Sequence, residues 1–146
     1  MRLTDNAELL NFYINHSEVR PFVAPDEAGY IDTTEIVARP DTYLFATENG
    51  CLLFFRGDDS IYRIDAYFPR KSGAIPAILK GLDFIFKTVG ARKVIAEAPE
   101  FHLACRMLIV SQGFHLIDRK AKAFKKDNKL YDVLIYEKEN PNGKHS

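Results

Sequence analysis

Several features that mark other classes of protein are missing from this sequence of 146 residues. No run of about 18 or more apolar residues occurs, so no membrane-spanning helix is expected. The opening residues 1–5 lack the apolar segment of a secretory signal. These two absences lead us to expect a cytoplasmic protein.

Cysteine is also scarce, which limits the chemistry that the chain offers. The two cysteines, Cys51 and Cys105, form no redox or metal motif, and buried reduced thiols are expected. No pair of histidines or cysteines has the spacing of a zinc site, so we expect no metal site. The sequence also contains no P-loop and no Ser-His-Asp arrangement.

The length suits a single domain, and no internal repeat divides the chain. We expect one domain over residues 1–140 and a disordered tail over residues 141–146.

Charge is balanced overall but unevenly distributed. Residues 1–68 carry 12 acidic and 5 basic side chains, whereas residues 69–146 carry 8 acidic and 15 basic side chains. A basic C-terminal half is typical of a chain that meets an anion there, although a solvated basic hairpin explains it equally well. That hairpin contains six basic residues: Arg119, Lys120, Lys122, Lys125, Lys126 and Lys129. Only Phe124 lies among them, which disfavours a nucleic-acid surface built on stacking.

The first third of the chain predicts two short helices. Helical spacing of apolar residues favours a helix over residues 5–15. Residues 15–21 come next, and a loop rich in proline, aspartate and glycine then extends as far as residue 32. A second helix is expected over residues 33–38, ended by Arg39-Pro40, because the residue before proline resists the helical region.

An antiparallel meander of three strands is predicted next. Residues 43–47 and 51–55 are strand-like and flank Asn49-Gly50, a strong hairpin turn. Residues 60–68 then alternate, with Asp65 on one face.

The second half alternates helices and strands. Apolar spacing predicts a helix that ends at Gly90 and begins a residue or two late because of Pro76. A buried strand over residues 93–98 and a helix from Pro99 to Gly113 follow. The expected apolar set of that last helix is Leu103, Met107, Leu108 and Val110. A final hairpin joins residues 114–124 to residues 130–137.

This order of elements predicts the fold class. The crossover from the strand at residues 60–68 to the strand at residues 93–98 requires a parallel pair, so the sheet is mixed. We expect an α/β (α+β) protein with a mixed, mostly antiparallel central sheet flanked by helices.

Two segments carry a resemblance to a known family. Residues 101–114 end in Gly113-Phe114 and place Cys105 where a small residue is expected, which resembles the GNAT N-acetyltransferases. Residues 70–75 resemble the pyrophosphate loop of that family, whose backbone N–H groups hold the diphosphate of CoA at a helix N-terminus. The resemblance implies acetyl-CoA or another acyl-CoA as cofactor. It implies a cofactor site made of Phe68, Arg70, Lys71, Ser72, Gly73, Ala74 and His102.

Three positions that handle phosphate or a proton in that family depart from its pattern. Ile75 stands where glycine or alanine lets phosphate approach, and Pro76 removes one N–H donor. Ile109 occupies the place of the tyrosine that protonates the leaving thiolate. The departures indicate a degenerate catalytic site.

The chemistry that the resemblance implies needs a base for the acceptor amine. On family geometry, Asp65 is the first candidate for this base and Glu97 the second. Both are also explained as ordinary strand residues, solvated or paired with Arg63 or Lys93. His16 and His102 as catalytic groups are weaker candidates, because a hydrogen-bonded structural imidazole is commoner.

A narrower resemblance concerns residues 15–21, Asn-His-Ser-Glu-Val-Arg-Pro, which look like the start of small GNAT-like proteins of tailed bacteriophages. Some of those are labelled head assembly or internal virion proteins. Two hypotheses therefore stand. The first is an acyl-CoA N-acyltransferase that acts on a small-molecule or protein amine. The second is a non-catalytic module that binds phage structural proteins in the host cytoplasm or the virion.

Overall fold

A single mixed sheet of seven strands organises the chain in the computed structural model, which describes residues 1–25, 28–71 and 73–142. The strands lie in the order β1-β2-β3-β4-β5-β7-β6, and every neighbouring pair is antiparallel except β4 and β5. Their bounds are β1 (Arg2–Thr4), β2 (Thr42–Ala46), β3 (Cys51–Arg56), β4 (Ile61–Tyr67), β5 (Lys93–Pro99), β6 (His115–Lys126) and β7 (Lys129–Glu139). The predicted fold class, the three-stranded meander and the parallel crossover are confirmed.

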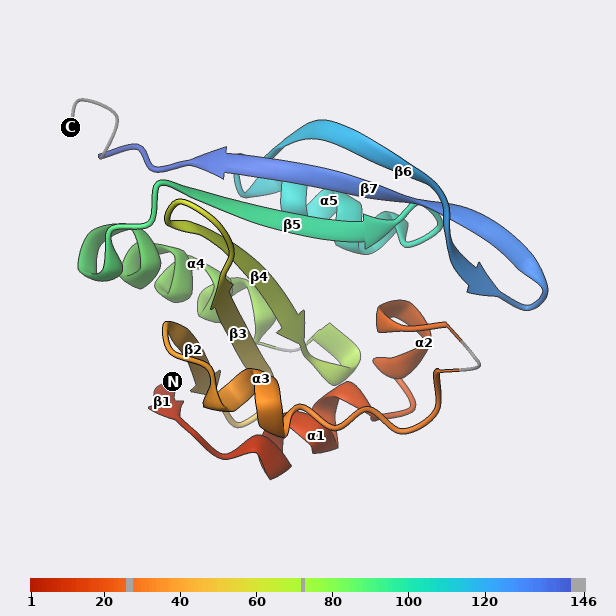
Figure 1. The fold of residues 1–146 in the computed structure, drawn as a ribbon, viewed down its shortest axis with the longest axis horizontal. Helices are drawn as coiled ribbons and strands as arrows, with labels where there is room; N and C mark the ends of the chain where they lie inside the picture. The colour runs from red at the N-terminus through yellow and green to blue at the C-terminus, as the bar shows by residue number, and fades with distance from the viewer. Residues whose placement is uncertain (26–27, 72, 143–146) are drawn as a thin grey trace.

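Helices cover both faces of the sheet (Figure 1). They are α1 (Ala7–Ile14), α2 (Arg20–Val23), α3 (Thr34–Ala38), α4 (Ala74–Asp83), its π-helical extension Phe84–Val89, and α5 (Leu103–Ser111). The helices predicted over residues 5–15 and 33–38 correspond to α1 and α3. Among the described residues, no helix is long and apolar enough to span a membrane.

Each face of the sheet has its own hydrophobic core, as the alternation along β3 shows. Leu52 and Phe54 are fully buried in the cluster that includes α4. Cys51 and Leu53 point the other way, into the cluster that includes α1. Burial raises the pKa of the Cys51 thiol to about 12, so this thiol stays protonated and inert, as expected for a packing residue.

Two helix starts differ from the prediction. Helix α4 begins at Ala74, with Pro76 as its third residue. The first N–H groups of a helix have no intrahelical acceptor, so a proline there costs no hydrogen bond, and the expected delay was wrong. Helix α5 begins at Leu103 rather than at Pro99, because Pro99 still belongs to β5 and pairs with Val133.

The expected apolar set of α5 was also wrong in part. Leu103, Met107 and Val110 are more than half exposed, and Leu108 packs against the core together with Ile109. Helical spacing alone does not tell which of two apolar stripes meets the sheet.

The sequence did not predict two short elements. Strand β1 has three residues and pairs with β2. Helix α2 spans the end of the segment at residues 15–21 and the start of the expected loop. The Arg20 guanidinium donates hydrogen bonds to the carbonyl oxygens of Ala24, Pro25 and Gly29. These bonds fold the loop back on the helix, which is a contact that composition does not reveal.

The turn at Asn49-Gly50 is confirmed, but its glycine is needed for space rather than for a positive φ. A Cβ on Gly50 would lie 2.5 Å from the Tyr67 carbonyl oxygen and 2.5 Å from Cδ2 of Phe68. Since a backbone atom is the obstacle, the strands themselves would have to move.

Gly50→Ala is therefore expected to lower the free energy of unfolding by about 1–3 kcal/mol, the usual cost of overpacking. Urea denaturation followed by circular dichroism measures the change. Gly57→Ala is the matched control, because its Cβ would lie 3.5 Å from the Ile61 carbonyl oxygen, an ordinary contact. Equal stability of the two variants would contradict the prediction.

Candidate functional site

The parallel strands β4 and β5 separate halfway along their length. They pair only from Ile61 with Lys93 to Arg63 with Ile95, although the strands continue to Tyr67 and Pro99. Figure 1 shows the two strands diverging toward α2. Beyond this point the unpaired ends of the two strands, residues 64–67 and 96–99, leave a wedge-shaped gap between them in the middle of the sheet, which we call the wedge.

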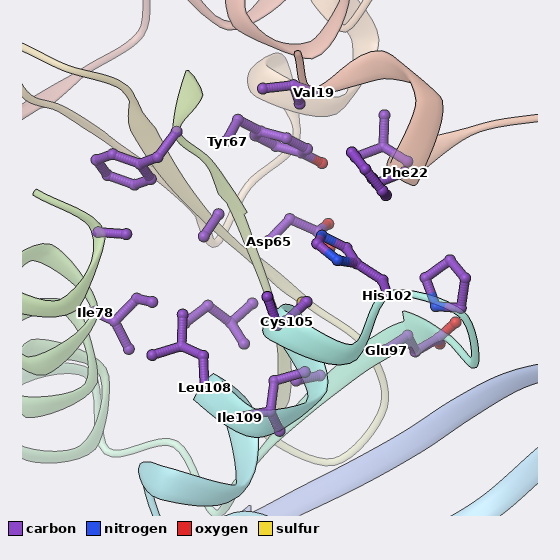
Figure 2. Close-up of a pocket in the computed structure, with 18 of the residues that line it drawn as sticks. Val19, Phe22, Asp65, Tyr67, Ile78, Glu97, His102, Cys105, Leu108 and Ile109 are labelled. Carbon is purple, nitrogen blue, oxygen red and sulfur yellow. The ribbon is translucent and has the colours of Figure 1, made fainter. Parts of the chain in front are cut away.

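A cavity of about 540 Å³ occupies this wedge. Successive residues of a strand point to opposite faces, yet Ile64, Asp65, Ala66 and Tyr67 all line the same space. The cavity therefore passes through the sheet and opens toward both helical layers. Figure 2 shows side chains from β4, β5, α2 and α5 around it.

The layer of α4 and α5 makes one end of the cavity apolar. Leu108 and Ile109 project into it from α5, and Ile78 projects from α4 (Figure 2). Cys105 is half-buried at the same end. This wall is apolar and offers no proton donor at position 109.

The opposite end carries a compact ionic network. The Arg63 guanidinium lies 3.3 Å from Asp65 Oδ1 through Nε and 3.3 Å from Glu97 Oε2 through Nη1. The Asp65 and Glu97 side chains are each only 17% exposed. The structure thus brings the two predicted carboxylates together. Both pair with Arg63, as expected if they are ordinary strand residues. Glu137, not Glu97, pairs with Lys93.

The buried environment of Asp65 changes its affinity for a proton. Burial raises the pKa of Asp65 above its ordinary value, and the Arg63 charge and hydrogen bond only partly oppose this. The Tyr67 hydroxyl also hydrogen-bonds to Asp65, and burial raises the pKa of Tyr67 well above its ordinary value, so that the hydroxyl keeps its proton. A carboxylate whose affinity for a proton is raised is better suited to act as a base.

The predicted cofactor residues lie at the start of α4 and around the cavity. Phe68, Arg70, Ala74 and His102 line the cavity. Gly73 is the N-cap of α4 with φ of 78°, a left-handed conformation that glycine adopts without strain.

The rest of the predicted loop is less informative. Lys71 closes a 3-10 turn, Pro69–Lys71, and Ser72 lies outside the described residues. The Arg70 guanidinium is 83% exposed and lies 3.8 Å from the Glu18 carboxylate. Arg70 is thus free to reorient toward an anion at the helix start.

The N-terminal segment supplies a further wall of the cavity. Glu18, Val19, Phe22 and Val23 line the cavity, and the Phe22 ring stacks on His102 with ring centres 4.1 Å apart. In the sequence, the motif at residues 15–21 points to this wall, because its last two residues begin α2.

The basic hairpin closes the same side. Lys126 Nζ lies 4.8 Å from the Phe22 ring centre and 4.9 Å from that of Phe101. These contacts, about 0.5–2 kcal/mol each depending on solvation, attach the tip of the hairpin to α2. His16 Nε2 lies 4.0 Å from Glu18 Oε2, and His16 does not line the cavity.

Comparison with solved structures identifies the fold. The ribosomal-protein-S5-alanine acetyltransferase from Vibrio fischeri matches with a TM-score of 0.76 and 12% identity over 97% of this chain and 93% of that one. A spermidine N-acetyltransferase chimera from Vibrio cholerae and hSSAT matches with a TM-score of 0.66 and 13% identity over 78% and 79%. A GCN5-related N-acetyltransferase from Brucella melitensis matches with a TM-score of 0.59 and 15% identity over 71% of this chain and 53% of that one.

No family model and no curated protein sequence matches the chain. At these identities the likeness concerns the fold alone. The chain therefore has the GNAT fold, as its sequence motifs predicted.

Proposed function

We propose that the protein is an acyl-CoA-dependent N-acyltransferase. The observation that carries the proposal is the cavity through the sheet, which is apolar toward α4 and α5 and carries Asp65 and Glu97 at its other end. Two substrates that enter from opposite faces would meet in the wedge between β4 and β5. Holding two reactants in this way supplies a large part of a transfer rate.

The start of α4 fits the diphosphate of CoA. The N–H groups of Ala74 and Ile75 are in the first helical turn, where no intrahelical acceptor exists, and the helix dipole favours an anion. Ile75 is half exposed and does not line the cavity, so its side chain leaves the helix start open. Bound there, acyl-CoA supplies the acyl group as a thioester.

Asp65 is the proposed base in this reaction. It accepts a proton from the incoming amine, directly or through one water molecule, while Arg63 and Tyr67 hold its carboxylate in place. Glu97 carries two cationic contacts, to Arg63 and Lys120, and is the less available acceptor. Since Ile109 offers no proton, the leaving thiolate takes its proton from solvent.

Acetyl-CoA is expected to bind with micromolar affinity, measured by isothermal titration calorimetry. Gly73→Glu is expected to abolish binding, because it places a negative side chain at the start of α4. Gly90→Glu is the matched control: Gly90 is also left-handed, with φ of 80°, and ends the π-helical turn at the far end of the same helix. Absence of binding at millimolar acetyl-CoA would contradict the proposed function.

A non-catalytic role is the second candidate, favoured by the exposed apolar stripe Leu103, Met107 and Val110 on α5. In this role the protein is an assembly module of a tailed phage, with Ile109 marking a cavity that has lost its chemistry. Co-expression with phage capsid or portal proteins tests it. A stable complex that Met107→Glu dissolves would support this role, and a monomer without complexes would contradict it.

A further inference from the structure

A lysine of the hairpin contacts one of the two carboxylates that line the cavity. Lys120 Nζ lies 3.6 Å from Glu97 Oε2, the same oxygen that Arg63 contacts. The Lys120 side chain is 54% exposed, whereas Glu97 is 17% exposed and lines the cavity. An amine of the chain itself is therefore placed beside the proposed reaction centre.

The position of Lys120 depends on an irregularity in β6. Leu116 pairs with Tyr136 but Asp118 pairs with Ile135, so one extra residue lies between them. A one-residue shift moves every following side chain to the other face of a sheet. Without this bulge Lys120 would point toward α5; with it, Lys120 shares the face of the sheet that carries Glu97.

The register across three strands confirms this placement. Lys120 pairs with Val133 of β7, which pairs with Pro99 of β5, two residues beyond Glu97. Side chains two residues apart on a strand share a face. Lys120 thus reaches Glu97 across β7.

The register of β6 shifts a second time between Lys120 and Phe124, and hydrogen bonds to Asp132 hold the strand there. Asp132 accepts hydrogen bonds from the Lys122 N–H at 3.0 Å and from the Arg119 guanidinium at 2.7 Å. Both residues flank Lys120, so its backbone is fixed on either side while its side chain remains accessible. The amine is positioned without being enclosed.

We propose that Lys120 is an acyl acceptor within its own chain. The inference rests on the proposed acyl transfer activity. Glu97 takes one proton from the Lys120 ammonium, and the neutral Nζ attacks the thioester carbonyl carbon of acetyl-CoA. The C–N bond forms, the C–S bond breaks, and the bonding pair leaves with sulfur. The surplus proton on nitrogen passes to that thiolate, so the products are Nζ-acetyl-Lys120 and CoA thiol.

Modification of Lys120 has a direct electrostatic consequence. An acetylated amine carries no charge, so Glu97 loses one of its two cationic partners and keeps Arg63. The carboxylate becomes more available to an external amine, and the acetylated side chain no longer competes with that amine for Glu97.

Lys87 provides an internal reference for this proposal. Its Nζ pairs with Asp83 at 2.8 Å and its side chain is 63% exposed, close to the exposure of Lys120. Asp83 does not line the cavity. Both lysines are paired and exposed, and only Lys120 is paired with a carboxylate that lines the cavity.

The experiment incubates the purified full chain with acetyl-CoA and follows acetylation of each lysine by peptide mass spectrometry. General-base catalysis is typically worth about 10²–10⁴-fold, so Lys120 should be acetylated at least about 10²-fold faster than Lys87. N-hydroxysuccinimidyl acetate, which needs no cavity, gives the intrinsic reactivity of the two lysines and should show no such preference. Glu97→Gln should remove the preference seen with acetyl-CoA, and the first-order rate should not change with protein concentration.

The outcomes separate this inference from the activity on which it rests. Calorimetric binding of acetyl-CoA together with equal acetylation of Lys120 and Lys87 would overturn self-acylation and leave the proposed function standing. A rate that rises with protein concentration would overturn transfer within one chain. Absence of acetyl-CoA binding would overturn both proposals.

Discussion

Asp65→Asn is expected to slow acyl transfer by about 10²–10⁴-fold, the range that a positioned general base supplies. The amide has nearly the shape of the carboxylate but accepts no proton. Binding of acetyl-CoA should persist, because Asp65 lies at the carboxylate end of the cavity and the start of α4 is unchanged. Release of the CoA thiol with a panel of primary amines measures the rate, and calorimetry measures binding.

The same substitution should not destabilise the fold at neutral pH. Since the pKa of Asp65 is raised in the folded state above its ordinary value of 3.8, the folded chain holds this proton more tightly than the unfolded chain. The stabilisation that this proton gives the folded chain is fully present at pH values below the ordinary pKa of 3.8. It is lost as the pH rises through the pKa of Asp65 in the folded chain. Ionised Asp65 thus lowers the free energy of unfolding at neutral pH. The asparagine variant carries no charge at this position and should avoid that destabilisation.

Asp59→Asn is the control, because Asp59 is an exposed carboxylate that pairs with Arg92 at 2.9 Å outside the cavity. Its transfer rate should equal that of the unmodified chain. A nearly full rate in Asp65→Asn would remove Asp65 from the mechanism and direct attention to Glu97.

Ala66→Phe is expected to weaken acetyl-CoA binding by about 100-fold or more, or to abolish it. Ala66 is exposed within the wedge, where β4 has already parted from β5. A benzyl group there would fill the space between the strands. One hundredfold corresponds to about 2.7 kcal/mol of binding free energy, well within the cost of blocking a site.

Stability should hardly change in this variant, since the ring enters open space rather than a packed core. Substitutions at such positions usually change the free energy of unfolding by about 0.5 kcal/mol or less. Ala121→Phe is the matched control, an exposed alanine on β6 that does not line the cavity. Tight binding by Ala66→Phe would show that acetyl-CoA does not use the wedge.

The order of elements was predictable because each element has a characteristic spacing of apolar residues over a short stretch of sequence. Alternation gave the three-stranded meander, and the crossover between residues 60–68 and 93–98 required the parallel pair that the structure contains. The wedge was not predictable in this way. The alternation of β4 continues to Tyr67, and nothing in its pattern marks Arg63 as the last paired residue, because pairing depends on a partner far along the chain.

The site shows the same division. The resemblance singled out Asp65 and Glu97, and the structure brings them together through Arg63. Phe22 was missed because its place in the cavity wall depends on a stack with His102, some 80 residues away. Contacts between distant segments leave no spacing or period that a single sequence displays.

The three residue pairs between β4 and β5 have a mechanical consequence. On one side of this seam stand β1 to β4, and on the other stand β5, β7 and β6, and neighbouring strands within each group pair with one another. This seam and the β1–β2 pairing have three residue pairs each, fewer than any other pairing in the sheet, so we expect the two groups to move relative to one another about the seam while their own ladders remain intact. Native-state hydrogen exchange should resolve them as two cooperative units. The width of the wedge would then vary with this breathing motion, and a ligand that spans it would protect amides on both sides at once.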